Sequence, residues 1–252
     1  MPENKREAED RVEGKNAVME ALKAGRPLDK IYVAKGEQDK TLRYLIQKGK
    51  AAGAVISEVD RRKLDAMSVT HAHQGIIAVA ALREYVSLED ILTMARERGE
   101  APLVVVCDEI TDPHNLGAII RSAECVGAHG VVITRHRSAG ITAVVEKTSA
   151  GAVEHMAVAR VTNLAAALDS LKAAGLWVCG TAADGEQSLW EADLTTGIAL
   201  VIGSEGSGMS RLTKEKCDHL LSIPLKGKVS SLNASAAAAV VLYEALRQRT
   251  AK

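Results

Sequence analysis

Apolar and polar positions along the first hundred residues change every few residues, and the segments they define are short. Helical spacing alternates there with apolar stretches of strand length, so the pattern predicts a small α/β unit. A usual helix stop, glycine followed by proline, ends the first helix. The predicted elements are a helix over 14–25, a strand over 30–35, a helix over 39–53, a strand over 54–59, a short helix over 61–67 and a strand over 74–82.

From Leu103 onward the apolar runs become longer and lose their alternation. Continuous Val/Ile/Leu runs are typical of strands that are buried on both faces of a parallel sheet. Helical patterns separate them, and this alternation predicts an open, mainly parallel α/β sheet. The predicted strands cover 103–108, 130–135, 176–182, 197–205 and 219–225, and the predicted helices cover 116–128, 141–152, 164–175 and 234–249. A connecting helix capped by Ser87 joins the two parts.

Composition narrows the class of protein. The chain has 252 residues, and 32 basic side chains balance 32 acidic ones. No apolar run is long enough to cross a bilayer and the N-terminus has no apolar signal region, so we expect a cytoplasmic protein. The four cysteines have no metal-binding spacing and are expected to be reduced packing residues. Few aromatic residues argue against a base-stacking platform, and the neutral balance speaks against nucleic acid.

The first candidate motif is DEITDPHNLGAIIRSAE, residues 108–124. A strand ends at Asp108, a polar turn follows, and Asn115 stands where a helix cap is expected. Arg121 then interrupts an apolar helix. Taken singly, a cap and a surface ion pair would explain both residues. Together they follow the carboxyl end of a strand, where open α/β sheets bind ligands.

The second and third candidate motifs lie near the end of the chain. In IALVIGSEGSGMS, residues 198–210, a strand runs into a glycine-rich turn that carries Glu205. Its glycines are not spaced as in a dinucleotide or Walker A loop. In residues 220–246, Pro224 interrupts a strand, and a polar loop with Ser230, Ser231 and Asn233 precedes an alanine-rich helix. Each segment alone is also compatible with ordinary structure.

In this order and spacing, the three segments resemble the three motifs of the SpoU (TrmH-like) RNA ribose 2′-O-methyltransferases of the SPOUT class. The resemblance covers residues 103–249 and implies a C-terminal trefoil knot, which is otherwise nearly absent from proteins. The preceding unit resembles the L30e-like RNA-binding domain of many members. The arrangement is most similar to the bacterial 23S rRNA guanosine 2′-O-methyltransferases. The resulting domain prediction is a disordered tail over 1–10, an RNA substrate-binding domain over 11–83, a linker over 84–100 and a catalytic domain over 101–252.

This resemblance implies methyl transfer from S-adenosylmethionine (SAM) to a ribose 2′-hydroxyl, with no metal. It places Arg121 at the catalytic centre against the target phosphate. Because a guanidinium stays protonated, its conservative role is to anchor phosphate and stabilise a developing alkoxide. The implied catalytic residues are Asn115, Arg121, Glu205, Ser231 and Asn233. The implied SAM-binding residues are Thr181, Gly203, Ile223, Leu225 and Leu232.

The resemblance also implies a homodimer with each active site completed near the subunit interface, and RNA, not DNA, as the substrate. Charge is distributed unevenly, because residues 11–83 hold 14 basic and 8 acidic residues, a net of +6. Residues 101–252 hold 14 and 15, a net of −1. The basic clusters could be ordinary solvated faces, but an RNA-docking front domain joined to a nearly neutral catalytic domain explains the charge distribution better. Candidate RNA-binding residues are Arg61, Arg62, Lys63, Arg135 and Arg137.

Alternative functions stay open at this point. The target could be a tRNA instead of 23S rRNA, because nothing in the three motifs selects a nucleotide. A non-catalytic RNA-binding assembly protein could keep the same fold, although the intact set of polar motif residues argues against it. A dinucleotide-dependent enzyme that uses the GSEGSG turn is disfavoured by the order and the late position of that turn.

Overall fold

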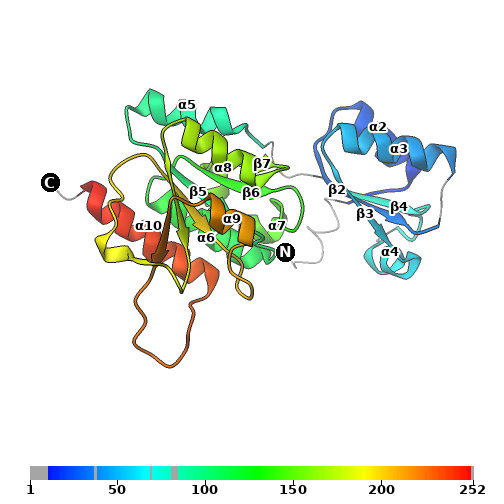
Figure 1. Cartoon of the computed structure of the whole chain (residues 1–252). Helices are drawn as coiled ribbons and strands as arrows, with labels where there is room; N and C mark the ends of the chain where they lie inside the picture. The colour runs from blue at the N-terminus through cyan, green and yellow to red at the C-terminus, as the bar shows by residue number, and fades with distance from the viewer. Residues whose placement is uncertain (1–10, 37–38, 69, 81–84, 251–252) are drawn as a thin grey trace. The chain divides into compact units, whose positions relative to one another are not determined.

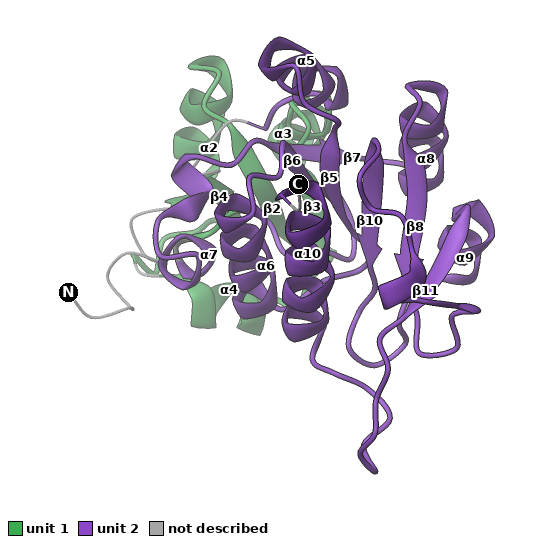
Figure 2. Ribbon diagram, turned by 90° about the vertical axis from the view of Figure 1, so that its left-hand side faces the viewer, with its two compact units in different colours: residues 1–84, 141–143 green, residues 85–140, 144–252 purple. Residues whose placement is uncertain are grey.

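A computed structural model describes residues 11–36, 39–68, 70–80 and 85–250. The predicted tail over 1–10 and the predicted domain boundary at 83/84 lie outside these residues. The chain divides into two compact units (Figure 2). Unit 1 holds the described residues up to 80 together with 141–143, and unit 2 holds 85–140 and 144–250.

Unit 1 is a four-stranded sheet with helices on both faces (Figure 1). The strand order is β1-β4-β2-β3, in which β2 and β3 are parallel and the other pairs are antiparallel. Helices α2 and α3 pack on one face around Ile31 and Leu45, and α4 packs on the other through Leu64. Its elements are β1 (Arg11–Glu13), α2 (Lys15–Lys23), β2 (Leu28–Ala34), α3 (Lys40–Ala51), β3 (Val55–Val59), α4 (Arg61–Met67) and β4 (Ile76–Ala80).

Unit 2 is built on a seven-stranded sheet of order β7-β6-β5-β10-β8-β11-β9, in which every strand pair is parallel. The predicted open α/β sheet is therefore confirmed. Its strands are β5 (Leu103–Cys107), β6 (Gly130–Thr134), β7 (Val158–Val161), β8 (Trp177–Thr181), β9 (Gln187–Ser188), β10 (Ile198–Ile202) and β11 (His219–Ser222). Strands β5 and β10 are buried at every position, as their unbroken apolar runs predict.

Helices cover both faces of this sheet. Helices α6 and α10 lie side by side on one face (Figure 2), and α5 and α8 pack their apolar side chains on the other. The helices are α5 (Leu88–Arg98), α6 (Pro113–Cys125), α7 (Ala143–Thr148), α8 (Leu164–Ala173), α9 (Arg211–Lys216) and α10 (Ala234–Thr250), with short 3-10 turns η1 (Ala152–Glu154) and η2 (Leu189–Glu191). Among the described helices, none is long and apolar enough to span a membrane.

The stretch predicted as a linker belongs to unit 2 instead. Helix α5 has the expected Ser87 cap, which forms a capping box with Asp90. Its Ile91 and Leu92 are buried in the unit 2 core, where they contact the sheet. The burial of this apolar face fixes the helix to the sheet, so the described part of 84–100 is not a free connection.

Two smaller sequence expectations are also corrected. The cap of α6 is Asp112, whose side chain accepts a hydrogen bond from the His114 amide, while Pro113 occupies the first helical position. Asn115 lies inside the first turn. Cys107 and Cys179 are buried, and burial raises the pKa of each thiol to about 12, but Cys125 is exposed and does not pack in the core.

Candidate active site

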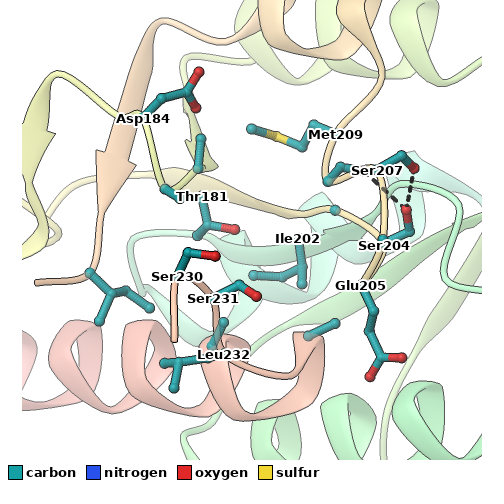
Figure 3. Close-up of a pocket in the computed structure, with 18 of the residues that line it drawn as sticks. Thr181, Asp184, Ile202, Ser204, Glu205, Ser207, Met209, Ser230, Ser231 and Leu232 are labelled. Atoms are coloured by element: carbon teal, nitrogen blue, oxygen red, sulfur yellow. Dashed lines mark hydrogen bonds between the residues drawn. The ribbon is translucent and has the colours of Figure 1, made fainter. Parts of the chain in front are cut away.

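A pocket lies where the carboxyl ends of strands β10, β8 and β11 meet at one edge of the sheet. From β5 the chain adds β6 and β7 on one side, and the later strands β8, β10 and β11 lie on the other side of β5. The strand order therefore reverses between β5 and β10, which makes this position a topological switch point. The pocket has a volume of about 410 Å³, within the range of small-molecule sites. Apolar side chains that include Ile202 and Met209 line it together with the hydroxyl groups of Thr181, Ser230 and Ser231 (Figure 3).

One wall of the pocket is the glycine-rich loop after β10. The loop closes on itself through paired backbone hydrogen bonds of 3.0 Å between Ser204 and Gly208. A Cβ atom on Gly203 would lie 2.3 Å from the backbone nitrogen of Met209, so only glycine permits this return of the chain. Gly208 has φ of 66°, in the left-handed region. The glycines therefore shape the loop itself and hold Glu205 at its tip.

Asp108, for which no role is predicted from the sequence, anchors this loop to the neighbouring strand. It is buried, and its carboxylate accepts a 2.7 Å hydrogen bond from the backbone amide of Ser210. Its own amide donates to the carbonyl of Ile202 at 2.9 Å. In the sequence, Asp108 directly follows an apolar strand, and a carboxylate buried there requires a hydrogen-bond partner. This position is the signal by which its role could have been predicted. Asp108 thus ties the first motif to the second.

A polar network joins the three motifs. The side-chain amide of Asn115 donates to Oε1 of Glu205 at 2.7 Å. The amide of Asn233 donates to the same oxygen and, at 3.0 Å, to Oδ1 of Asn115. Asn233 also begins α10, because its Oδ1 accepts from the backbone amides of Ser235 and Ala236. Residues more than a hundred positions apart are therefore fixed around one carboxylate.

All five predicted SAM-binding residues line the pocket, and Glu205 and Ser231 of the catalytic set line it as well. In the described part of the chain, no acceptor is found for the backbone amides of Leu225 and Leu232. The apolar side chains of the pocket can bury the flat base of a nucleoside. The unpaired backbone amides can donate hydrogen bonds to the polar atoms of that base. These residues therefore fit SAM.

Arg121 is not brought to this network. It is exposed on α6, it does not line the pocket, and none of the described residues forms an ion pair or hydrogen bond with it. The helix explains the separation, because six residues turn the chain to a direction about 120° from that of Asn115. The expected contact between Arg121 and the polar set is therefore absent from the described part of a single chain.

Sequence reasoning also missed a charged pair at the pocket mouth. Asp184, in the loop after β8, and Lys214, on α9, both line the pocket and lie 3.1 Å apart. The hydrogen bond from Lys214 lowers the pKa of Asp184. Nothing in a single Asp-Gly turn marks it as part of a site. Elsewhere in the described residues, no cluster of three or more potential metal-ligating side chains occurs.

The candidate RNA-binding residues are placed differently in the two units. Arg61, Arg62 and Lys63 are exposed on α4 of unit 1, and the Lys63 ammonium lies 5.9 Å from the centre of the Tyr32 ring. In unit 2, Arg137 is exposed and pairs with Glu109 at 2.8 Å. Arg135 is half-buried, and its Nε has no hydrogen-bond partner in the structure. The cluster on α4 is thus the more accessible of the two.

With this geometry established, family models match both parts of the chain. Residues 102–243, more than half of the chain, match the SpoU rRNA methylase family. Residues 11–86 match the RNA 2′-O ribose methyltransferase substrate-binding family. The chain belongs to the SpoU family. The resemblance inferred from the three motifs is thereby confirmed, and the protein is a SAM-dependent RNA methyltransferase.

Individual SpoU relatives agree. YacO of Bacillus subtilis (strain 168), named as a TrmH family tRNA/rRNA methyltransferase, is 49% identical over 240 residues, covering 95% of this chain and 96% of YacO.

Among solved structures, the SpoU methyltransferase AviRb of Streptomyces viridochromogenes in complex with AdoMet is 28% identical. The match covers 98% of this chain and 94% of AviRb, with a TM-score of 0.60. The TrmH/SpoU tRNA modifying enzyme of A. aeolicus is 30% identical over 64% of this chain and 84% of that one, with a TM-score of 0.54. The SPOUT fold is therefore confirmed, while the trefoil knot stays a prediction.

Proposed function

We propose that the protein transfers the methyl group of SAM to the ribose 2′-hydroxyl of a guanosine in 23S rRNA and so acts in rRNA processing. The observation that carries the proposal is the Asn115–Glu205–Asn233 network at the edge of a pocket that fits SAM. The front unit supports an RNA target, because residues 11–86 match a substrate-binding family and residues 11–83 have a net charge of +6. Such RNA and its methyl donor are cytoplasmic.

A division of labour between the two parts of the chain follows. Residues 11–83 bind the RNA, with Arg61, Arg62 and Lys63 of α4 as contacts to phosphate. Residues 101–252 hold SAM and perform the transfer. Bound SAM supplies an electrophilic methyl group on a sulfonium, and the protein must bring a ribose hydroxyl into line with it.

The geometry of Glu205 indicates how the hydroxyl is handled. Its Oε1 accepts hydrogen bonds from two side-chain amides, and no described residue donates to Oε2. The fixed Oε2 is available to accept a hydrogen bond from the 2′-hydroxyl, which orients the attacking oxygen. The Ser231 hydroxyl lines the same pocket. In this proposal it contacts the ribose.

Arg121 acts by electrostatics in this scheme. Its guanidinium binds the phosphate next to the target ribose and stabilises the alkoxide that develops as the 2′-hydroxyl proton passes to Oε2 of Glu205. We expect Arg121→Ala to abolish methyl transfer while SAM still binds, as measured by radiolabel transfer and by equilibrium dialysis. Full activity of Arg121→Ala would contradict this mechanism.

We further propose a homodimer in which Arg121 of one protomer completes the site of the other. The support is its exposure on α6, away from the pocket of its own chain. Mixing Arg121→Ala with Asn115→Ala, each inactive or nearly so, then restores about a quarter of the wild-type rate, because half of the randomly exchanged dimers carry one intact site. No restoration in a mixture shown to exchange subunits would refute the shared site.

The target is tested in cells. Sites of 2′-O-methylation are mapped across rRNA and tRNA from a strain that lacks the gene and from its parent. We expect one guanosine of 23S rRNA to lose its methyl group in the deletion strain and to regain it on complementation. Loss of methylation from a tRNA instead would favour the other substrate known among SpoU relatives, and unchanged methylation in both RNAs would contradict the proposal.

A further inference from the structure

The loop between β11 and α10, residues 223–233, makes few contacts with the rest of its chain. Residues 224–233 are all exposed, and Val229 exposes 75% of its surface. Within the described part of the chain, residues 224–232 form no hydrogen bond or ion pair. In Figures 1 and 2 the loop projects beyond the sheet. We call it the motif-three loop.

This loop adjoins the reaction centre at both of its ends. Ile223 and Leu225 line the pocket at its start, and Ser230, Ser231 and Leu232 line it at its end. The segment closes on Asn233, which donates to Glu205. Nucleotides that flank a ribose at Glu205 can therefore extend along the loop from its ends toward its exposed middle.

Two cations occupy that middle. Lys226 and Lys228 are exposed and have no carboxylate or acceptor partner in the described chain. Carboxylates pair with several other cations of unit 2, namely Lys172, Arg211, Lys214, Lys216 and Arg247, whereas Arg121 on α6 is also exposed and has no partner among the described residues. Since residues 101–252 have a net charge of −1, positive potential that can reach phosphate is scarce in this part of the chain.

We propose that Lys226 and Lys228 bind the phosphates of the RNA strand that flanks the target ribose. The inference rests on the proposed function and adds a docking element on the catalytic part, separate from the front unit. Phosphate contacts of this kind fix register and orientation without reading sequence. The motif-three loop then has two tasks: its ends hold SAM and its middle holds RNA.

The test is binding of the full-length protein to unmodified 23S rRNA transcribed in vitro, measured over a range of salt concentrations. Losing two single-strand phosphate contacts lowers the slope of log K against log salt by about 1.4 and weakens binding at 0.1 M salt roughly 25-fold. We expect Lys226→Gln/Lys228→Gln to show both changes. Its SAM affinity and melting temperature should equal those of the wild type, because neither lysine lines the pocket or contacts the fold.

The matched control is Lys172→Gln/Lys216→Gln, which removes two lysine charges from the same unit at sites already paired with Asp218 and Asp169. We expect its RNA affinity to stay within about twofold of wild type, since paired surface charges contribute little. The charge-retaining Lys226→Arg/Lys228→Arg variant should bind as the wild type does.

Equal salt slopes for Lys226→Gln/Lys228→Gln and the wild type, or equal losses in that variant and the control, would overturn the inference. The proposed function is judged separately. If the wild-type protein methylates 23S rRNA but the loop variant binds RNA normally, only the loop assignment fails. If the wild type methylates no RNA, the proposed function itself fails.

Discussion

Replacing Asn115 by alanine tests whether the polar network serves the reaction or only the fold. Asn115 is 6% exposed, and its side chain makes two hydrogen bonds, one of them to a carboxylate. A neutral hydrogen bond contributes about 1 kcal/mol and one to a charged group about 1.5–3 kcal/mol. Glu205 and Asn233 are exposed, so water can replace part of their lost hydrogen bonding. We therefore expect the two hydrogen bonds of Asn115 to contribute about 2 kcal/mol in total to the interaction energy of the network, and this energy is lost in the alanine variant.

That loss corresponds to a decrease of about 30-fold in kcat/KM if the network holds Glu205 for the transition state. The assay is transfer of a labelled methyl group from SAM to RNA under single-turnover conditions, with urea unfolding measured in parallel. SAM affinity should remain within about threefold, because Asn115 does not line the pocket.

Asn163→Ala is the control for this experiment. Asn163 begins α8 in the same unit and caps it, because its Oδ1 accepts a 3.1 Å hydrogen bond from the Ala166 amide. Its removal should lower the free energy of unfolding by about 1 kcal/mol and leave kcat unchanged. If Asn115→Ala lost stability in the same way but kept kcat/KM within threefold of wild type, the network would be scaffold only and the catalytic reasoning would be refuted.

Two further predictions concern the loop and the last helix. Gly203→Ala places a methyl group 2.3 Å from the Met209 nitrogen, so the loop must open and SAM affinity, measured by calorimetry, should fall at least tenfold; unchanged affinity would contradict the fixed loop. Hydrogen bonds from Arg247 and Gln248 lower the pKa of Glu244 from 4.5 to about 2. The ionised carboxylate therefore stabilises the fold above pH 4.5, and this stabilisation is lost as the pH falls toward 2. Glu244→Gln should therefore flatten the unfolding free energy over that range, and an unchanged acid limb would argue against this pair.

The sequence was most informative where residues had to be buried or had to end a strand. Unbroken runs such as LVVVC and IALVI predicted the buried strands β5 and β10, since no solvated face interrupts them. Short elements were missed: β7 contains Arg160, and β9 has only two residues. Such segments lack the periodicity on which the prediction depends.

Local chemistry also misled the prediction at α6. Asn115 has a good capping side chain, but Pro113 at the first helical position makes Asp112 the cap. That signal was present in the sequence. Asn115 is free of a capping role and instead uses its amide to hold Glu205.

The site depends on strand order, which periodicity does not provide. The insertion of β10 between β5 and β8 brings Glu205 to Asn115 across 90 positions. The three motifs located the catalytic part through their resemblance to a family. Arg121 lies outside the pocket because the turn of α6 directs it away from Asn115. The resemblance of the motifs did not predict this separation.

The central claim is that this chain methylates a ribose hydroxyl of RNA. The most direct test incubates the purified protein with labelled SAM and unmodified 23S rRNA, digests the RNA to nucleosides and identifies the product by mass spectrometry. We predict that the label appears in 2′-O-methylguanosine, and that Arg121→Ala yields none. Label on a base instead of a ribose, or no label in RNA despite measurable SAM binding, would contradict the claim.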